Sequence, residues 1–167
     1  MSEEKARPYV HLLEGRDAAE VMRATPSRLI KVLTALTPEQ LEYKPAEHKW
    51  SIREILCHMA DCEVAWAWRL RQVYGADDPT LQPFEQDAWA KAYDGVEYTT
   101  EAARSVWIPL RRWNLALIGA LSEADKRRPA HHPELGNITL WDIVEIAAGH
   151  DLHHVTQLEK VVAAAGA

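Results

Sequence analysis

Three histidines near the C-terminus have the residue type and spacing of metal ligands. His150 and His154 are four residues apart, so on a helix they lie on one face and can direct two imidazoles at one ion. His153 is three residues from His150 and could replace His154 in principle. The apolar pattern favours His154, because His153 is rotated from it by about 100°. The inward stripe consists of Ile143, Ala147, His150, His154, Gln157 and Val161.

A third ligand is expected from another helix, since two nitrogens alone make a weak site. His58 is the candidate, because it follows Ile55 by three residues and precedes Cys62 by four. Asp61 lies one turn further along and is expected to orient the His58 imidazole, or alternatively to be a fourth ligand. Gln157 lies on the ligand side and could hydrogen-bond a metal-bound water.

Core packing is the competing interpretation of the same histidines. A histidine on an apolar face is often a hydrogen-bonded core residue, and the H-x-x-x-H spacing also arises by chance. Composition and spacing therefore leave metal binding and ordinary packing open. The remaining histidines are expected in loops or at the surface: His11, His48, His131 and His132.

The elements that position these residues are predicted to be helices, because apolar residues recur every three or four positions and strand alternation is nearly absent. Four long segments are expected over residues 17–36, 51–74, 100–121 and 139–164. The first is predicted to be interrupted at Thr25-Pro26, and Pro109 is expected to kink the third. Shorter helical pieces are predicted from Thr37 and over residues 84–91. Residues 43–49, 77–83 and 125–137 are predicted to be loops.

Capping residues support these boundaries. Ser51 and Glu54 form a capping box at the start of the second long helix, and Thr139 can cap the last one. Four long helices in 167 residues predict an all-α four-helix bundle. No repeat or second domain is evident, so residues 1–167 are expected to form one domain with its core over about 17–162.

The composition of the chain limits the kinds of partner that the protein is expected to bind. The net charge is −6, and the absence of a basic face argues against nucleic acid. No apolar run reaches the ~20 residues needed to cross a bilayer, and no secretion signal is visible, so a cytoplasmic location without a membrane partner is expected. Cys57 and Cys62 match no disulfide or C-x-x-C pattern and are expected to be reduced, partly buried thiols.

Two blocks of sequence resemble the DinB and YfiT-like superfamily. Residues 50–61 read WSIREILCHMAD and are similar to its W-S-[IV]-x-E-[IV]-[LV]-x-H-[LM]-x-D signature, and residues 150–157 read HDLHHVTQ and are similar to its H-x-x-x-H-x-x-Q ending. The resemblance extends over residues 17–162. It implies a four-helix bundle with a three-histidine metal site that falls on His58, His150 and His154.

The resemblance also implies candidate functions. It suggests one divalent metal ion, zinc or nickel first and iron or manganese as alternatives, and a homodimer. Relatives include thiol-dependent S-transferases, so a metal-dependent transfer onto a low-molecular-weight thiol, or a related hydrolysis, is expected. Asp61 and Glu54 would orient groups or shuttle protons. The alternative is a non-catalytic, metal-stabilised structural or sensing protein, in which one of Trp66 and Trp68 marks a dimer contact.

Overall fold

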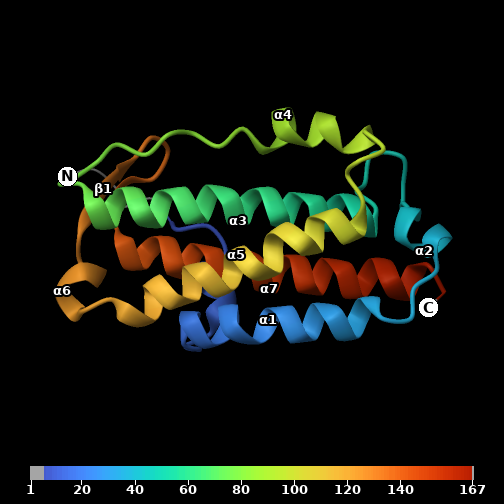
Figure 1. Ribbon diagram of the computed structural model, residues 1–167, viewed down its shortest axis with the longest axis horizontal. Helices are drawn as coiled ribbons and strands as arrows, with labels where there is room; N and C mark the ends of the chain where they lie inside the picture. The colour runs from blue at the N-terminus through green and yellow to red at the C-terminus, as the bar shows by residue number, and fades with distance from the viewer. Residues whose placement is uncertain (1–5, 167) are drawn as a thin grey trace.

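Four long helices lie side by side in the computed structural model, which describes residues 6–166 (Figure 1). They are α1 (Ala18–Leu33), α3 (Ile52–Gly75), α5 (Thr100–Ala120) and α7 (Leu140–Ala164). Helices α1 and α7 run in one direction, and α3 and α5 run in the other. Each of α1 and α3 packs against both α5 and α7. The predicted four-helix bundle is confirmed, and α3 and α7, which carry the candidate ligands, are direct neighbours.

Side-chain caps define where the long helices begin. The Ser51 hydroxyl accepts from the Glu54 amide, and the Glu54 carboxylate accepts from the Ser51 amide at 2.7 Å. Thr139 and Asp142 make the same reciprocal pair at the start of α7. Both predicted caps are confirmed. They fix the rotation of α3 and α7 at their first turns, and with it the direction in which the later histidines face.

Helix α1 continues through Pro26, so the predicted interruption at Thr25-Pro26 is wrong. Thr25 does not cap a new helix, because its hydroxyl donates to the Val21 carbonyl at 2.8 Å within the preceding turn. Proline has no N–H and leaves the carbonyl four residues earlier without its helical donor. That carbonyl belongs to Met22, and it accepts a hydrogen bond from the Arg111 guanidinium at 3.1 Å. A tertiary contact thus replaces the missing helical bond.

Short elements fill the connections. They are 3-10 helices at Val10–Leu13 and Lys91–Asp94, helices α2 (Pro38–Glu42), α4 (Gln86–Ala90) and α6 (Glu123–Lys126), and strands β1 (Pro129–His132) and β2 (Gly136–Thr139). The prediction of a loop over residues 125–137 is therefore wrong. The two strands pair antiparallel, with the buried residues Ala130 and Ile138 opposite each other. Backbone hydrogen bonds of His131 to Pro79 and Leu81 fasten this hairpin to the chain that follows α3.

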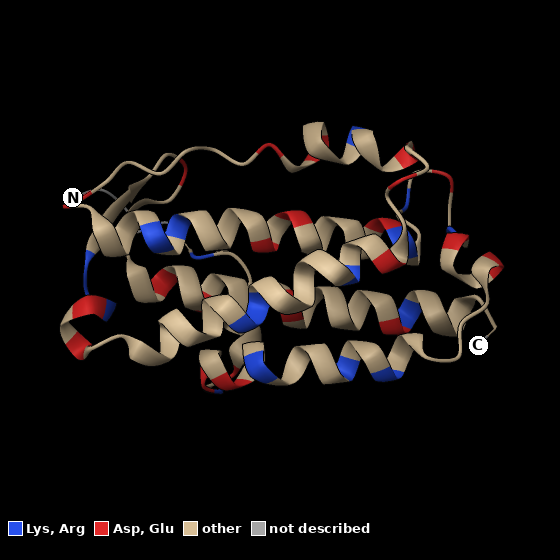
Figure 2. Cartoon of the chain, in the orientation of Figure 1, with Lys and Arg blue, Asp and Glu red and all other residues tan. Residues whose placement is uncertain are grey.

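Two clusters of buried apolar residues follow one another along the bundle. One contains Trp66 on α3 and Ile143 on α7, and the other contains Ile55 on α3 and Leu158 on α7. On α7, His150 and His154 lie between the two clusters in sequence, and on α3 His58 lies at the end of the second cluster, next to the start of the first at Cys62. Figure 2 shows lysine and arginine interspersed with acidic residues along the chain. No helix among residues 6–166 is long and apolar enough to span a membrane.

Candidate metal centre

His58 on α3 and His150 on α7 meet inside the bundle. Their Nε2 atoms lie 3.1 Å apart, although the residues are 92 positions apart in the chain. Both side chains are buried, with His58 1% and His150 6% exposed. The packing of α3 on α7 therefore brings together two of the three predicted ligands, with the same ring nitrogen of each directed at the other.

His154 completes a group of three imidazoles. Its ring centroid lies 4.3 Å from that of His150 and 4.8 Å from that of His58. Its Nδ1 is 2.7 Å from Oε1 of Gln157, an acceptor, so the ring proton is on Nδ1 and Nε2 carries the lone pair. Gln157 therefore orients the His154 ring. The sequence had suggested instead that Gln157 could hydrogen-bond a metal-bound water. His153 is exposed, and its ring centroid lies 4.8 Å from that of Tyr9 and 4.9 Å from that of His154, so it borders the group from the solvent side.

Cys62 is a fourth donor that the sequence prediction missed. Its Sγ lies 3.4 Å from Nε2 of His58 and 3.5 Å from Nε2 of His150. The donor atoms of these three buried residues all lie within 4.8 Å of one another. The signal was present in the sequence, because Cys62 follows His58 by four residues, the same one-turn spacing that singled out His150 and His154.

The donor set fits a divalent metal ion. Zn–N bonds of about 2.0–2.1 Å in a tetrahedral site place two nitrogens about 3.3 Å apart, and a Zn–S bond of about 2.3 Å places sulfur about 3.5 Å from each nitrogen. The corresponding distances among His58, His150 and Cys62 are 3.1, 3.4 and 3.5 Å. The three atoms therefore have nearly the separations of one face of a coordination tetrahedron. The His154 ring adjoins two of these donors.

Burial keeps the imidazoles neutral, which is the form that binds a metal. It lowers the pKa of His58 to about 4, and the pKa of His154 to about 3 with a further contribution from His58. Burial also lowers the pKa of His150 well below its usual value, and His154, His58 and His153 add to the effect. Burial raises the pKa of the Cys62 thiol well above its ordinary range, so a bound cation would be needed to form its thiolate at neutral pH.

Asp61 and Glu54 have other partners than those expected. Asp61 accepts a hydrogen bond from the Tyr93 hydroxyl at 2.8 Å, and no hydrogen bond to His58 is found among the described residues. Burial raises the pKa of its carboxyl group, and the Tyr93 hydrogen bond partly offsets this shift. Glu54 is occupied by the Ser51 cap and by Lys44, whose Nζ lies 2.7 Å from it. Neither carboxylate hydrogen-bonds an imidazole of the described residues, because each is bonded to other partners.

The other histidines mostly lie where the sequence placed them. His11, His48 and His131 are exposed. His132 was expected to be exposed but is half-buried, because the hairpin turns it toward α3 and its Nδ1 accepts the backbone amides of Glu134 and Leu135. Cys57 is buried with its Sγ 3.5 Å from the Tyr98 carbonyl, on a different side of α3 from Cys62.

A buried ionic network lies next to the candidate metal centre. The Arg111 guanidinium on α5 donates to Glu63 on α3 at 2.6 and 2.9 Å and to Asp151 on α7. All three side chains are at most 1% exposed. Burial alone would lower the pKa of Arg111, but the carboxylates of Asp151 and Glu63 raise it. Glu63 follows Cys62, and Asp151 follows His150, so the network holds the backbone directly beside two donors.

The fold and the site together define a helical-bundle protein with a buried histidine cluster suited to a divalent ion. A family model described as the DinB superfamily matches residues 22–158. The chain belongs to the DinB superfamily, which confirms the resemblance in the two sequence blocks.

Named relatives are similar over most of their length. A protein of Geobacillus kaustophilus is 30% identical over 143 residues, 84% of this chain and 79% of its own, and one of Oceanobacillus iheyensis is 28% identical over 135 residues, 80% and 78%. Both are named "Putative metal-dependent hydrolase". The solved structure of YfiT from Bacillus subtilis, described as a probable metal-dependent hydrolase with an unusual four-helix bundle topology, superposes with a TM-score of 0.79 at 18% identity. It covers 99% of this chain and 93% of YfiT.

Proposed function

We propose that the protein is a metal-dependent enzyme in which His58, His150 and His154 hold one divalent cation. The observation that carries the proposal is the convergence of three buried, neutral imidazoles, of which His150 lines a cavity together with Cys62. Three neutral imidazoles leave the cation its full charge and a fourth coordination position, which the sulfur of Cys62 or of a substrate thiol can fill. Such an ion lowers the pKa of a bound thiol or water and makes it a nucleophile at neutral pH.

Transfer of a low-molecular-weight thiol onto an electrophile is the reaction we favour. The position of Cys62 supports it, because a sulfur atom already lies 3.4–3.5 Å from two candidate ligand nitrogens without crowding them. In the transfer the thiol loses its proton to solvent, its sulfur forms a bond to carbon, and the leaving group departs with its electron pair. Nitrogen and sulfur donors suit zinc or nickel, whereas manganese prefers oxygen donors.

Hydrolysis is the second candidate, favoured by the names of the two relatives and by the description of YfiT. The same site would then activate water in place of a thiol. The two reactions share their metal ligands and differ in the nucleophile, so assays with and without a thiol can separate them.

The test is turnover by the zinc- or nickel-loaded protein. An activated aryl halide with cysteine or dithiothreitol reports thiol transfer, and p-nitrophenyl acetate without thiol reports hydrolysis. We expect His58→Ala to abolish the activity and His153→Ala to retain it. Thiol consumption no faster than in His58→Ala, together with no ester cleavage, would contradict the enzymatic proposal. If chelation then lowered the melting temperature, the alternative of a metal-stabilised structural or sensing protein would replace it.

We also propose that the protein forms a homodimer. Trp66 is 8% exposed, whereas Trp68, two residues later and on another face of α3, is 58% exposed. An exposed indole costs free energy in water and is frequent at interfaces. A monomeric mass of the purified chain by light scattering would contradict this proposal.

A further inference from the structure

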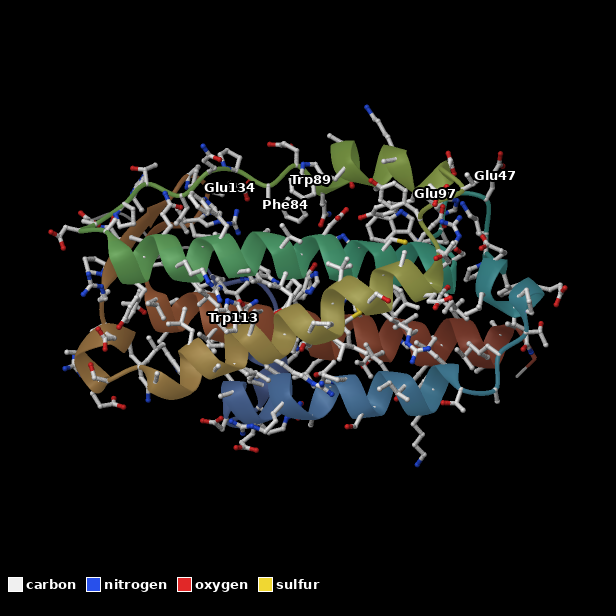
Figure 3. The ribbon with its side chains drawn as sticks, viewed as in Figure 1. Glu47, Phe84, Trp89, Glu97, Trp113 and Glu134 are labelled. Carbon is white, nitrogen blue, oxygen red and sulfur yellow. The ribbon has the colours of Figure 1, made fainter. Side chains whose placement is uncertain are left out.

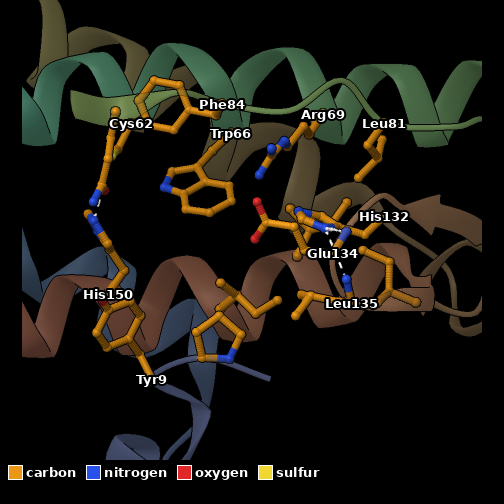
Figure 4. A pocket seen from close by; sticks show the side chains of 15 residues that line it. Tyr9, Cys62, Trp66, Arg69, Leu81, Phe84, His132, Glu134, Leu135 and His150 are labelled. Carbon is orange, nitrogen blue, oxygen red and sulfur yellow. Dashed lines mark hydrogen bonds between the residues drawn. The ribbon is translucent and has the colours of Figure 1, made fainter. Parts of the chain in front are cut away.

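A cavity of about 170 Å³ leads from the candidate metal centre toward the β1–β2 hairpin. Figure 4 shows Cys62 and His150 at one end, the Trp66 indole in the middle, and Arg69 and Glu134 at the other end. Leu81 and Phe84 also line it. Since one water needs about 15 Å³ of such volume, the cavity holds on the order of ten non-hydrogen atoms. Its two ends thus offer different chemistry to one small molecule.

Arg69 is a buried cation with most of its donors unused. It is 7% exposed, and its Nη2 donates to the Gln82 carbonyl at 3.0 Å. That is its one hydrogen bond within residues 6–166, although a guanidinium has five N–H groups. Its charged carbon lies 5.5 Å from the centre of the Trp66 ring. Glu134 compensates this charge only in part, since burial still lowers the pKa of Arg69. The unused N–H groups of the guanidinium therefore favour an anionic group that they can bind in bidentate fashion.

The hairpin turn places two more polar groups at the same end. His132 accepts two backbone amides at its Nδ1, at 3.2 and 3.4 Å, so its neutral ring has the proton on Nε2 and is a donor there. Glu134 is on the exposed side of the turn and lines the cavity opposite Arg69 (Figures 3 and 4). A carboxylate beside the cation disfavours a second anionic group and favours a cationic substituent next to the first.

We propose that this end of the cavity binds the α-amino acid end of a small molecule, with its carboxylate on Arg69 and its ammonium group beside Glu134. The assignment rests on the proposed function, because it orients the rest of the molecule along Trp66 toward His150 and Cys62. The substrate class is then an amino acid or a thiol built on one. The two charges recognise the ligand, and the far end of the cavity holds the reacting group.

The test uses L-norleucine, which has no reactive side chain, together with L-norleucinamide and N-acetyl-L-norleucine. Calorimetric titration of the zinc-loaded protein should show at least tenfold weaker binding of the amide, which lacks the carboxylate, and weaker binding of the acetylated compound, which lacks the ammonium. Arg69→Gln should abolish the first preference, and Glu134→Gln should abolish only the second. Arg71→Gln, on the same helix but outside the cavity, should retain both.

Equal binding of L-norleucine and its amide to the unaltered protein would overturn the proposal, as would an unchanged preference in Arg69→Gln. Arg69→Lys keeps the charge and should retain a reduced preference, which guards against a loss of folding in Arg69→Gln. Chelation of the metal by the ligand is distinguished by repeating the titration on His150→Ala. A preference that disappears there but survives Arg69→Gln would overturn the proposal. An intact preference without turnover would instead contradict the proposed enzymatic function alone.

Discussion

The Arg111 guanidinium donates to both carboxylate oxygens of Asp151, the residue that directly follows His150 on α7. The same guanidinium donates twice to Glu63, which directly follows Cys62 on α3. One arginine on α5 therefore fixes the backbone beside two candidate donors on different helices. It also satisfies the Met22 carbonyl that Pro26 leaves without a donor on α1, so all four long helices meet at this side chain.

Removing this arginine should destabilise the fold and loosen the site. Arg111→Met leaves two buried carboxylates without their partner, a change that typically costs about 3–5 kcal/mol. We expect a loss of this size in urea denaturation, and weaker zinc binding because the donors are less firmly held. Arg112→Met is the matched control, since Arg112 is exposed on the next position of α5. Equal losses in the two variants would contradict a structural role for the network.

Gly149 should be sensitive to the smallest side chain. A Cβ at this position would lie 2.4 Å from the Tyr9 carbonyl oxygen, and Tyr9 already has a left-handed backbone with φ 63°. Gly149→Ala must displace the segment that carries Tyr9, and we expect about 1–3 kcal/mol of destabilisation. Gly119→Ala is the control, because it lies in α5 with open space around it. It should stabilise the protein by about 0.5–1 kcal/mol, and a similar loss in both would refute the close contact.

The metal-free protein should lose stability as the pH falls from about 6.5 toward 4. Burial lowers the pKa of His58 to about 4 and that of His154 to about 3, so below pH 6.5 the unfolded chain binds protons that the folded state does not. Each ring then removes on the order of 1.4 kcal/mol per pH unit. Urea midpoints in the presence of a chelator measure this slope.

His154→Gln should reduce the slope of the free energy of unfolding against pH by the contribution of about one titrating group. His131→Gln is the control, a histidine replaced at an exposed position outside the buried group. A slope that is the same in all three proteins would mean that the buried rings do not resist protonation.

Cys62 should bind the ion at the fourth coordination position whenever no substrate thiol fills it. The cobalt-substituted protein is expected to show a thiolate-to-cobalt charge-transfer band in the near ultraviolet, because Sγ lies within ligand spacing of His58 and His150. Cys62→Ser should lose the band. Cys57→Ser should keep it, since that buried thiol contacts the Tyr98 carbonyl instead. Absence of the band from the unaltered protein would show that the sulfur stays protonated and unbound.

The sequence predicted the bundle well where local signals agree. Ser51 with Glu54 marks the start of α3 and Thr139 marks that of α7, and the structure begins both helices there. The prediction from the sequence failed where contacts with residues far along the chain determine the local structure. Pro26 is tolerated in α1 because Arg111, 85 positions later, satisfies the freed carbonyl. The hairpin over residues 129–139 consists of four-residue strands, too short for a clear alternation, and depends on backbone bonds to residues 79 and 81.

The candidate site was predictable in its histidines and less so in its surroundings. Helical spacing places His150 and His154 on one face, and the pattern around His58 turns it inward, so these three could be found without coordinates. The roles of Asp61 and Gln157 could not, because their partners Tyr93 and His154 depend on exact side-chain directions. Nothing in the sequence singled out Arg69, because its proposed role depends on a cavity that α3 forms with the hairpin.

Metal stoichiometry by elemental analysis is the sharpest test of the proposed ligands. We expect about one zinc or nickel ion per chain in the unaltered protein, and loss of the metal in His58→Ala, His150→Ala and His154→Ala. His153→Ala should retain it, because this exposed neighbour lies outside the cluster. Equal loss in His153→Ala and His154→Ala, or full metal content in His58→Ala, would contradict the assignment of the ligands.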